Sequence, residues 1–482
     1  MIKKFKKNSV IDIEITDISP EGYGSTILTC EDETTLCILV PFSFPGDRVK
    51  VSLFKKKNKI MGHILELLYP SNKRITAKCE HFTQCGGCQW QHITYQKQLE
   101  LKQKLVIHCL SDSWRKETTL FPIIPSDLPW KYRNKAEFTF STDKAMNRYL
   151  GFILYNSRGK VFNLSSCQLI PDWMNQIVHA VKEWWIISNL DAYHAMKDRG
   201  SLRTLTLREG KRTNDKMVIL TVSGNANFAL NSQQLKSFTA TIKTSLPKES
   251  QMGQLSIFLR IQQIAKGKKT QFYEMQLDGP DHIIETMQNQ NLSENNFLKF
   301  RISPPAFFQP NTTQAEKLYH RVVEMAAINK ESVVYDLYCG TGTLGIFLAK
   351  YVKKVYGIEL SADACLDAKE NIKQNELNNI TIYQGDVAVV LPSLIQEEEH
   401  PDLVIVDPPR AGLDRKALSY LISLAALKVI YVSCNPVTQG NDLKELAQAG
   451  YQLAASQAID QFPHTVHVEN IILLTYSKQN EI

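Results

Sequence analysis

The chain has 482 residues, of which 43% are hydrophobic and 22% are charged. These values exclude collagen-like, disordered and disulfide-scaffold proteins, and the length predicts about three domains. Residues 1–300 carry 41 basic and 28 acidic side chains, whereas residues 301–482 carry 15 and 21. The asymmetry predicts a part that binds a polyanion and a more acidic catalytic part, although scattered solvated lysines would give the same count.

The sequence shows no membrane or secretion signal. No apolar run reaches the roughly 18 residues of a membrane span, and no apolar region follows the N-terminus. We therefore expect a cytoplasmic protein with no membrane partner, and nothing implies a protein partner. Because cytoplasmic thiols stay reduced, the 10 cysteines need another explanation, which is metal binding, catalysis or burial.

Residues 1–70 predict a small β unit. Short alternating runs are separated by turn signals such as Pro45-Gly46-Asp47, and strands at this spacing predict an OB-like barrel. The predicted strands cover residues 10–15, 25–29, 35–40, 48–54 and 59–68. Four lysines crowd the last hairpin, where they keep a sheet edge soluble or contact phosphates. They are Lys55, Lys56, Lys57 and Lys59.

Residues 71–300 predict a central domain of mixed α and β structure. The domain begins with a cluster of cysteines, and a predicted helix over residues 95–112 follows this cluster. Alternating patterns predict strands within residues 137–164, over 201–209 and over 216–223. The tryptophan-rich stretch 177–187 predicts a packed helix.

From residue 312 the pattern changes to regular β/α alternation, with helices over 312–327 and 362–375. Seven strands are predicted over residues 332–337, 354–360, 380–384, 402–406, 429–433, 452–459 and 468–476. This order predicts that residues 301–482 form an open, doubly wound, Rossmann-like α/β sheet.

A glycine-rich turn follows the first of these strands. Gly340, Gly342 and Gly345 fit a nucleotide-binding turn, and Glu359, 23 residues after Asp336, is placed to bind both ribose hydroxyls of an adenosine. The spacing fits NAD as well, but the Asp-x-x-Cys-Gly-x-Gly run favours S-adenosylmethionine. Asp386, after the third strand, is then either a neighbour of the adenine or an ordinary helix N-cap.

Two further positions carry residues suited to chemistry. Cys434 ends a buried strand, where a cysteine is either a nucleophile or, more commonly, a buried structural thiol. Glu469 is either a base or a carboxylate at a strand edge. With the cofactor turn, the two residues suggest alkylation assisted by a nucleophile.

Five motifs in this order resemble the RNA uracil-5-methyltransferase family. They are Gln309 in Phe307-Phe308-Gln309-Pro310-Asn311, the glycine turn, Asp407-Pro408-Pro409-Arg410, Ser433-Cys434-Asn435-Pro436 and His467-x-Glu469. Residues 1–70 resemble the family's TRAM RNA-binding module. The four cysteines Cys79, Cys85, Cys88 and Cys167 resemble the iron–sulfur ligands of the bacterial 23S rRNA members.

The resemblance implies a class I methyltransferase that uses S-adenosylmethionine to methylate C5 of a uridine in 23S rRNA. Cys434 would form a covalent adduct with C6 of uracil, and Glu469 would be the base. The implied cofactor contacts are Gln309, Tyr338, Glu359 and Asp407, to which the turn analysis adds Asp386. Asp407 alternatively reads the uracil edge.

Other interpretations stay open at this stage. The four cysteines hold a [4Fe-4S] cluster by resemblance, whereas spacing alone also fits zinc, with His81 and His92 nearby. The substrate is alternatively a tRNA uracil. A non-catalytic RNA-binding protein is disfavoured because Cys434 and Glu469 are both present.

Overall fold

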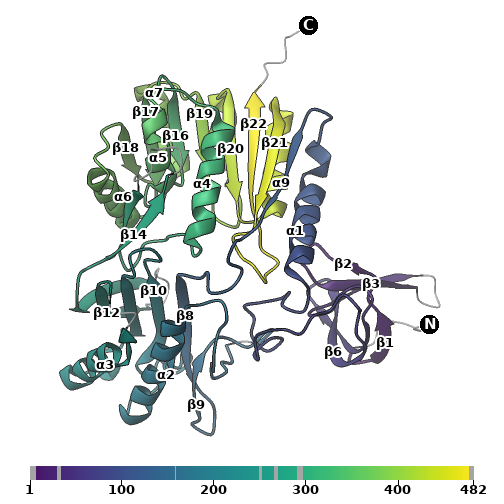
Figure 1. Cartoon of the computed structure of the whole chain (residues 1–482), viewed down its shortest axis with the longest axis vertical. Coiled ribbons are helices and arrows are strands. Elements are labelled where there is room, and N and C mark those ends of the chain that lie inside the picture. The colour runs from purple at the N-terminus through teal and green to yellow at the C-terminus, as the bar shows by residue number, and fades with distance from the viewer. Residues whose placement is uncertain are drawn as a thin grey trace.

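Figure 1 shows the computed structural model of the chain, in which three sheet-based parts are joined by a connecting segment. A six-stranded sheet lies near the N-terminus, a second one carries two helices, and an eight-stranded sheet contains the C-terminal strands. The structure describes residues 7–29, 34–157, 159–248, 252–264, 267, 270–289 and 297–476. Within these residues no helix is long and apolar enough to cross a bilayer. The predicted α/β multidomain class is confirmed.

The N-terminal sheet forms because apolar and polar side chains alternate, which buries one face of each strand. Val49, Val51 and Leu53 of β5 pack with Ile13 and Ile38 in a small core. The strands, in the order β1-β5-β6-β4-β3-β2, are β1 (Val10–Glu14), β2 (Asp17–Ile18), β3 (Gly24–Thr29), β4 (Thr35–Val40), β5 (Arg48–Lys56) and β6 (Lys59–Tyr69). All five predicted strands are present, and the barrel closure and the TRAM assignment stay predictions.

The connecting segment, residues 70–118, links this sheet to the C-terminal one. Helix α1 (Tyr95–Leu110) begins where the Thr94 side chain accepts a hydrogen bond from the backbone N–H of Lys97. The helix packs against α9 (Pro436–Gln448). The chain then enters β7 (Thr119–Ile124), which pairs in parallel with β21 (Tyr451–Ile459).

The central sheet has the order β13-β12-β11-β10-β8-β9, and helices α2 and α3 lie together against one of its faces (Figure 1). Trp184 and Trp185 of α2 are buried in that interface, so the predicted tryptophan-rich helix is confirmed. The elements are β8 (Lys135–Thr142), β9 (Arg148–Gly151), α2 (Asp172–Ile187), β10 (Leu202–Glu209), β11 (Lys216–Ser223), α3 (Ser232–Ser245), β12 (Leu255–Gln263) and β13 (Gln271–Asp278). A separate hairpin consists of β14 (Ile283–Gln288) and β15 (Phe297–Ile302).

The C-terminal sheet has the order β18-β17-β16-β19-β20-β22-β21-β7. One face packs against α4 and α5, and the other packs against α1, α7, α8 and α9. Its remaining strands are β16 (Val333–Leu337), β17 (Lys354–Glu359), β18 (Ile380–Gln384), β19 (Leu403–Val406), β20 (Lys428–Ser433) and β22 (Glu469–Tyr476). Its helices are α4 (Thr312–Ala326), α5 (Thr343–Leu348), α6 (Ala362–Gln374), α7 (Val387–Glu397) and α8 (Arg415–Leu424).

The C-terminal sheet differs from the prediction in one respect. All seven predicted strands are present, but β7 adds an eighth at the edge beside β21. This strand comes from the part of the sequence assigned to the central domain. The β14–β15 hairpin also crosses the predicted boundary at residue 300 and packs against α4, α5 and α6. The division at residues 70 and 300 stays a prediction.

Candidate functional site

The glycine-rich turn between β16 and α5 is fixed by two carboxylates. Asp336 accepts a hydrogen bond from the backbone N–H of Gly345 at 3.0 Å, and Glu359 accepts one from Gly340 at 3.0 Å. Gly340 and Gly342 have φ of 56° and 77°, a region that glycine enters without steric cost. The backbone therefore turns tightly at the carboxyl ends of β16 and β17, where open α/β sheets bind ligands.

A small cavity of about 50 Å³ lies beside this turn. Three of the predicted cofactor residues, Gln309, Tyr338 and Asp407, line it. Gln309 is buried, and its side-chain oxygen accepts a hydrogen bond from the amide of Gln461 at 3.2 Å. Burial raises the pKa of Asp407 to about 7. These three residues, from separate parts of the sequence, therefore meet at one site.

The other two predicted cofactor residues lie outside this lining. Glu359 uses its second oxygen to accept a hydrogen bond from the backbone N–H of Ser361 at 2.7 Å. Asp386 is exposed and caps α7, accepting a hydrogen bond from Ala388 N–H at 2.8 Å. The N-cap interpretation of Asp386 therefore describes its position in the structure, and a cofactor contact stays a prediction.

Cys434 and Glu469 lie at the ends of two paired strands. Ser433 at the end of β20 pairs with Asn470 of β22, which places the next residues, Cys434 and Glu469, beside each other. Burial and then the charge of Asp407 raise the pKa of Glu469 to about 8. Burial and then the charge of Glu469 raise the pKa of Cys434 to about 11. The pair is thus a thiol and a protonatable carboxyl in a site of low polarity.

Arg410 and His467 complete this group, and the sequence analysis counted neither among the catalytic or cofactor-binding residues. Arg410 hydrogen-bonds to Cys434, and its positive charge partly offsets the rise in the pKa of both Cys434 and Glu469. Its Nη2 atom lies 2.8 Å from Nδ1 of His467. Burial lowers the pKa of His467 to about 4, so a neutral imidazole accepts this hydrogen bond. Both residues belong to motifs that the sequence analysis quoted, and their place in those motifs is the sequence feature that could have identified them.

The loop before Glu469, residues 460–468, contacts two side chains of α1 and the indole of Trp130. Gln98 accepts a hydrogen bond from His464 N–H at 2.8 Å, and its amide lies 3.2 Å from His464 Nδ1. The indole of Trp130 stacks on the His464 ring, with centroids 3.7 Å apart. Lys102 and Asp460, both fully buried, form an ion pair at 2.5 Å. The connecting segment therefore holds the loop that leads to Glu469.

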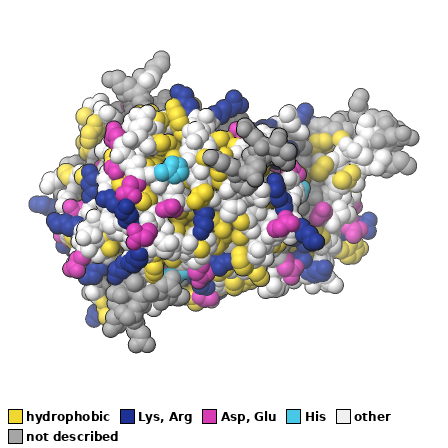
Figure 2. Space-filling model, turned by 90° about the horizontal axis from the view of Figure 1, so that it is seen from above, with side chains coloured by type: hydrophobic (Ala, Val, Ile, Leu, Met, Phe, Trp, Pro, Cys, Tyr) yellow, Lys and Arg dark blue, Asp and Glu magenta, His cyan; other side chains and the backbone are white. Residues whose placement is uncertain are grey.

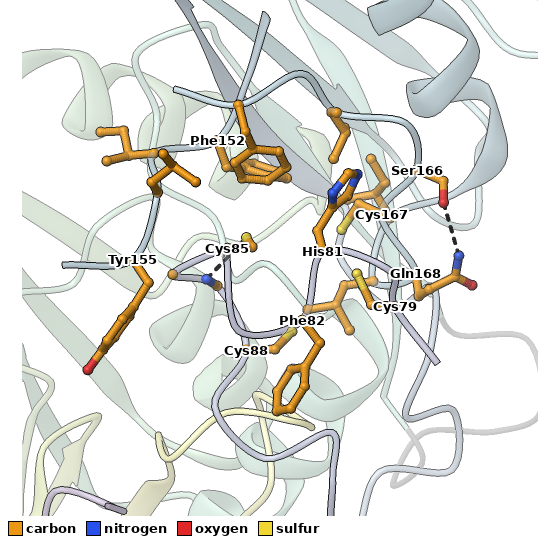
Figure 3. A pocket seen from close by; sticks show the side chains of 18 of the residues that line it. Cys79, His81, Phe82, Cys85, Cys88, Phe152, Tyr155, Ser166, Cys167 and Gln168 are labelled. Atoms are coloured by element: carbon orange, nitrogen blue, oxygen red, sulfur yellow. Dashed lines mark hydrogen bonds between the residues drawn. The ribbon is translucent and has the colours of Figure 1, made fainter. Parts of the chain in front are cut away.

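The four predicted metal-ligating cysteines surround one cavity of about 480 Å³. Figure 3 shows the sulfur atoms of Cys79, Cys85, Cys88 and Cys167 around a common space. The backbone N–H of Gly87 lies 3.3 Å from the sulfur of Cys85. Three of the cysteines come from a loop and the fourth from the segment before α2, so the cavity lies between the connecting segment and the predicted central domain.

Burial makes free thiolates unfavourable in this cavity. Burial raises the pKa of Cys85 to about 11 and that of Cys88 to about 12, and the charges of Cys79 and Cys167 add to both. A bound cation favours the thiolate form and offsets this cost. Within the described residues, no three side chains already converge on a single ion position.

We expect three buried carboxyls to make stability fall as the pH rises from about 4 to about 8. Burial raises the pKa of Asp336 and Asp407 to about 7 and that of Glu469 to about 8. The unfolded chain ionises these groups near pH 4, so the folded form binds their protons more tightly. This stability is fully present below about pH 4 and is lost as the pH rises through 7 to 8.

Differential scanning calorimetry of the ligand-free protein between pH 7 and pH 8 checks this expectation. The Tm should decrease over this range, and Glu469→Gln should make the decrease shallower. The histidines should contribute little, because His464 and His467 are neutral there in both states. A Tm that rises across the range would contradict the assignment of these three carboxyls.

Comparisons with known proteins agree with this geometry. A sequence model of the tRNA (uracil-5-)-methyltransferase family matches residues 226–387 and 393–477. An uncharacterized RNA methyltransferase of Protochlamydia amoebophila is 53% identical over 439 residues, which cover 90% of this chain and 99% of that protein. The chain belongs to this methyltransferase family. The predicted resemblance to RNA uracil-5-methyltransferases is thereby confirmed.

Two further relatives extend over nearly the whole chain. An uncharacterized RNA methyltransferase of Clostridium tetani is 32% identical and covers 98% of this chain and 97% of its own length. The crystal structure of Pyrococcus abyssi tRNA (uracil-54, C5)-methyltransferase in complex with S-adenosyl-L-homocysteine matches with a TM-score of 0.70 and 26% identity. That match covers 96% of this chain and 100% of the other. The similarity therefore includes the N-terminal parts as well as the C-terminal sheet.

Proposed function

We propose that the protein methylates C5 of a specific uridine in 23S rRNA, with S-adenosylmethionine as methyl donor and a covalent protein–RNA intermediate. The observation that carries this proposal is the placement of Cys434 beside Glu469, near the cavity that the glycine turn and Asp407 line. A nucleophile and a base side by side at a cofactor turn suit alkylation of an unreactive carbon. The target base would leave its stack to enter this site.

The proposed reaction begins with Cys434. Its thiol loses a proton to solvent, and the thiolate adds to C6 of uracil. The electron pair of the C5–C6 double bond moves to C5, which attacks the methyl carbon of S-adenosylmethionine; the bond between sulfur and the methyl group breaks, and S-adenosylhomocysteine is the leaving group. Glu469 removes the proton from C5, and the electron pair released re-forms the double bond and expels the Cys434 thiolate. Arg410, which lowers the pKa of Cys434, stabilises the attacking thiolate.

The cofactor residues have distinct proposed roles. Gln309, Tyr338 and Asp407 line the cavity at the turn and would contact the donor next to its reactive centre. Glu359, at the end of β17, would bind the ribose hydroxyls, and Asp386 would lie near the adenine. Asp407 is also close enough to Glu469 to raise its pKa, so it alternatively binds the uracil edge.

We also propose that the four cysteines hold a [4Fe-4S] cluster. The donor set fits, because four thiols surround a cavity larger than one ion needs. Zinc is the weaker alternative, because four thiolates that bind zinc must all lie about 2.3 Å from a single ion, whereas these four thiols surround a much larger cavity. His81 already has its Nε2 atom 3.0 Å from the N–H of Ser165, and His92 does not line the cavity. The cluster supplies structural support here and takes part in no step of the reaction.

Anaerobically purified protein should be brown and contain about four iron atoms with little zinc. Cys88→Ser should lose the iron and the visible absorption, because three thiolates leave one iron without a ligand. Cys109→Ser, outside the cavity, is the matched control and should retain both. Iron analysis and visible spectroscopy check this. A colourless protein that contains one zinc ion and loses it in Cys88→Ser would contradict the cluster.

The choice of 23S rRNA rests on the iron–sulfur and TRAM-like resemblance. A tRNA substrate is the alternative, which the name of the matching family and the P. abyssi structure favour. Residues 1–300 carry the excess of basic side chains that RNA binding needs. The face over the C-terminal sheet instead intersperses Lys and Arg with Asp and Glu (Figure 2). Either substrate places the proposed activity in the cytoplasm.

Mass spectrometry of nucleosides tests the proposal. The 23S rRNA and tRNA are isolated from cells with and without the gene, and 5-methyluridine is mapped in each. The proposal expects one or more 23S rRNA positions to lose 5-methyluridine, and complementation by the wild-type gene should restore them. A loss confined to tRNA would select the alternative substrate, and unchanged 5-methyluridine in both would contradict the activity.

A further inference from the structure

A cavity that the proposed reaction does not use lies between the N-terminal sheet and the loop that carries three of the cysteines. It measures about 420 Å³, within the range of about 300–1,000 Å³ that small ligands occupy in proteins. β5 and β6 form one wall, residues 41–42 and Arg74 form a second, and Thr83 with residues 155–156 closes it. Residues that lie far apart in the sequence, from 41 to 156, therefore build this pocket.

Aromatic rings form much of its surface. Phe42, Phe54 and Tyr155 line the pocket, and the rings of Phe42 and Tyr155 meet edge to face with centroids 4.8 Å apart. The ring of Tyr155 points away from the cysteine cavity (Figure 3). Phe42 has a φ of 63°, a strained conformation for a bulky residue that often occurs at ligand sites. Aromatic rings that line a cavity can stack on nucleic acid bases, at about 1–3 kcal/mol per base.

The polar side chains of the pocket suit an anion. Lys56, His63 and Arg74 line it, and no described lining residue has a carboxylate. Arg74 is fixed by Asp47, which accepts hydrogen bonds from its Nε and Nη2 atoms at 2.6 and 2.7 Å. The Nη1 edge of Arg74 is not used by either bond. Lys56 donates to the side-chain oxygen of Asn156 at 2.9 Å, which closes the pocket across two domains.

A second large cavity has the opposite charge and serves as a contrast. It measures about 600 Å³ and lies between the central sheet and α6. Five carboxylates and one guanidinium line it, from Glu274, Asp281, Asp363, Asp367, Glu370 and Arg301. Phosphates would be repelled there. The volume of a cavity therefore does not by itself indicate a site for RNA. The pocket at Phe42 is indicated by its aromatic and basic lining.

We propose that this pocket binds one unstacked nucleotide of the RNA substrate, at a site separate from the catalytic one. The base packs among Phe42, Phe54 and Tyr155, and Lys56, His63 and Arg74 bind its phosphates. The inference rests on the proposed function, because RNA is taken as the partner. The pocket thus selects RNA in which a second nucleotide can leave its stack at a fixed distance from the target uridine.

A pair of adjacent lysines offers a matched test. Lys55 and Lys56 are both exposed on β5, but only Lys56 lines the pocket. Lys55→Glu and Lys56→Glu change the net charge equally, so general attraction to RNA weakens equally in both. We expect Lys56→Glu to weaken binding of the 23S rRNA or tRNA transcript that the enzyme methylates by at least about tenfold more than Lys55→Glu. Equal losses would overturn the proposal.

Stacking is tested by a second pair of variants and by cross-linking. Phe54→Leu keeps an apolar side chain but loses the ring, and Phe272→Leu removes an exposed ring on β13 as the control. We expect weaker RNA binding only in Phe54→Leu, with unchanged affinity for S-adenosylmethionine. Ultraviolet cross-links to the bound transcript should map to peptides that contain Phe42, Phe54 or Tyr155.

The outcomes separate this proposal from the proposed function. If the wild-type enzyme methylates the transcript, but its cross-links lie elsewhere and Phe54→Leu binds normally, the pocket proposal is wrong and the activity stands. If no transcript is methylated, the proposed function fails. The same cross-linking and binding comparisons with 23S rRNA then still decide whether RNA occupies this pocket.

Discussion

Cys434→Ala is expected to lower the rate of uridine methylation by about 10⁴-fold or more. Without the thiolate nothing adds to C6, so C5 of uracil never becomes nucleophilic enough to accept the methyl group. Binding of S-adenosylmethionine should be unchanged, because Cys434 is not in the lining of the cavity at the glycine turn. Single-turnover methylation assays and calorimetric titration with the cofactor measure the two quantities.

Cys109→Ala is the control for this variant. Cys109 is also half-buried, but it lies on α1 and outside the site, so its removal should leave the rate within about twofold. Retention of most of the activity in Cys434→Ala would exclude covalent catalysis by this residue. A loss of cofactor binding in the same variant would mean that its effect is structural.

Lys102→Met is expected to lower the free energy of unfolding by about 3–5 kcal/mol. Lys102 and Asp460 are fully buried and form an ion pair, so the change leaves a buried carboxylate without its partner. Lys102 also donates to the carbonyl of Phe462 at 3.0 Å, and the loop before Glu469 loses this bond too. Denaturant unfolding measures the free energy.

Two comparisons make this expectation specific. Lys104→Met removes an exposed lysine from the same helix and should change the free energy of unfolding by less than about 0.5 kcal/mol. Lys102→Met combined with Asp460→Leu removes both charges and should recover most of the lost stability. A double variant as unstable as Lys102→Met would show that the ion pair is not the cause.

The sequence predicted the secondary structure of the C-terminal sheet well because its strands have strong local patterns. Buried parallel strands such as Leu403–Val406 are continuous apolar runs, and the turn after Val333–Leu337 contains glycine. The strand-end positions singled out Cys434 and Glu469, the resemblance favoured their catalytic roles, and the fold places the two residues beside each other. The predicted resemblance was confirmed by the family match.

What the sequence did not predict depends on contacts between distant residues. β7 has no local feature that assigns it to a sheet whose nearest strand lies more than 300 residues later, at β21. A lysine such as Lys102 on an amphipathic helix is expected to be exposed to solvent. Its partner Asp460 lies 358 residues later in the sequence, and only the fold brings the two together. The pocket at Phe42 likewise combines residues from 41 to 156 of the sequence, and no recognisable motif marks them.

The most direct test of the proposed mechanism is the fate of Cys434 when the base is missing. In Glu469→Gln, Cys434 can still add to C6 and methyl transfer can still occur, but removal of the C5 proton and release of the enzyme are slowed. The proposal predicts a long-lived protein–RNA adduct on a denaturing gel that carries label from methyl-labelled S-adenosylmethionine. The adduct should be absent from Cys434→Ala and from the double variant. Normal turnover by Glu469→Gln, or a labelled adduct that persists in Cys434→Ala, would contradict the account.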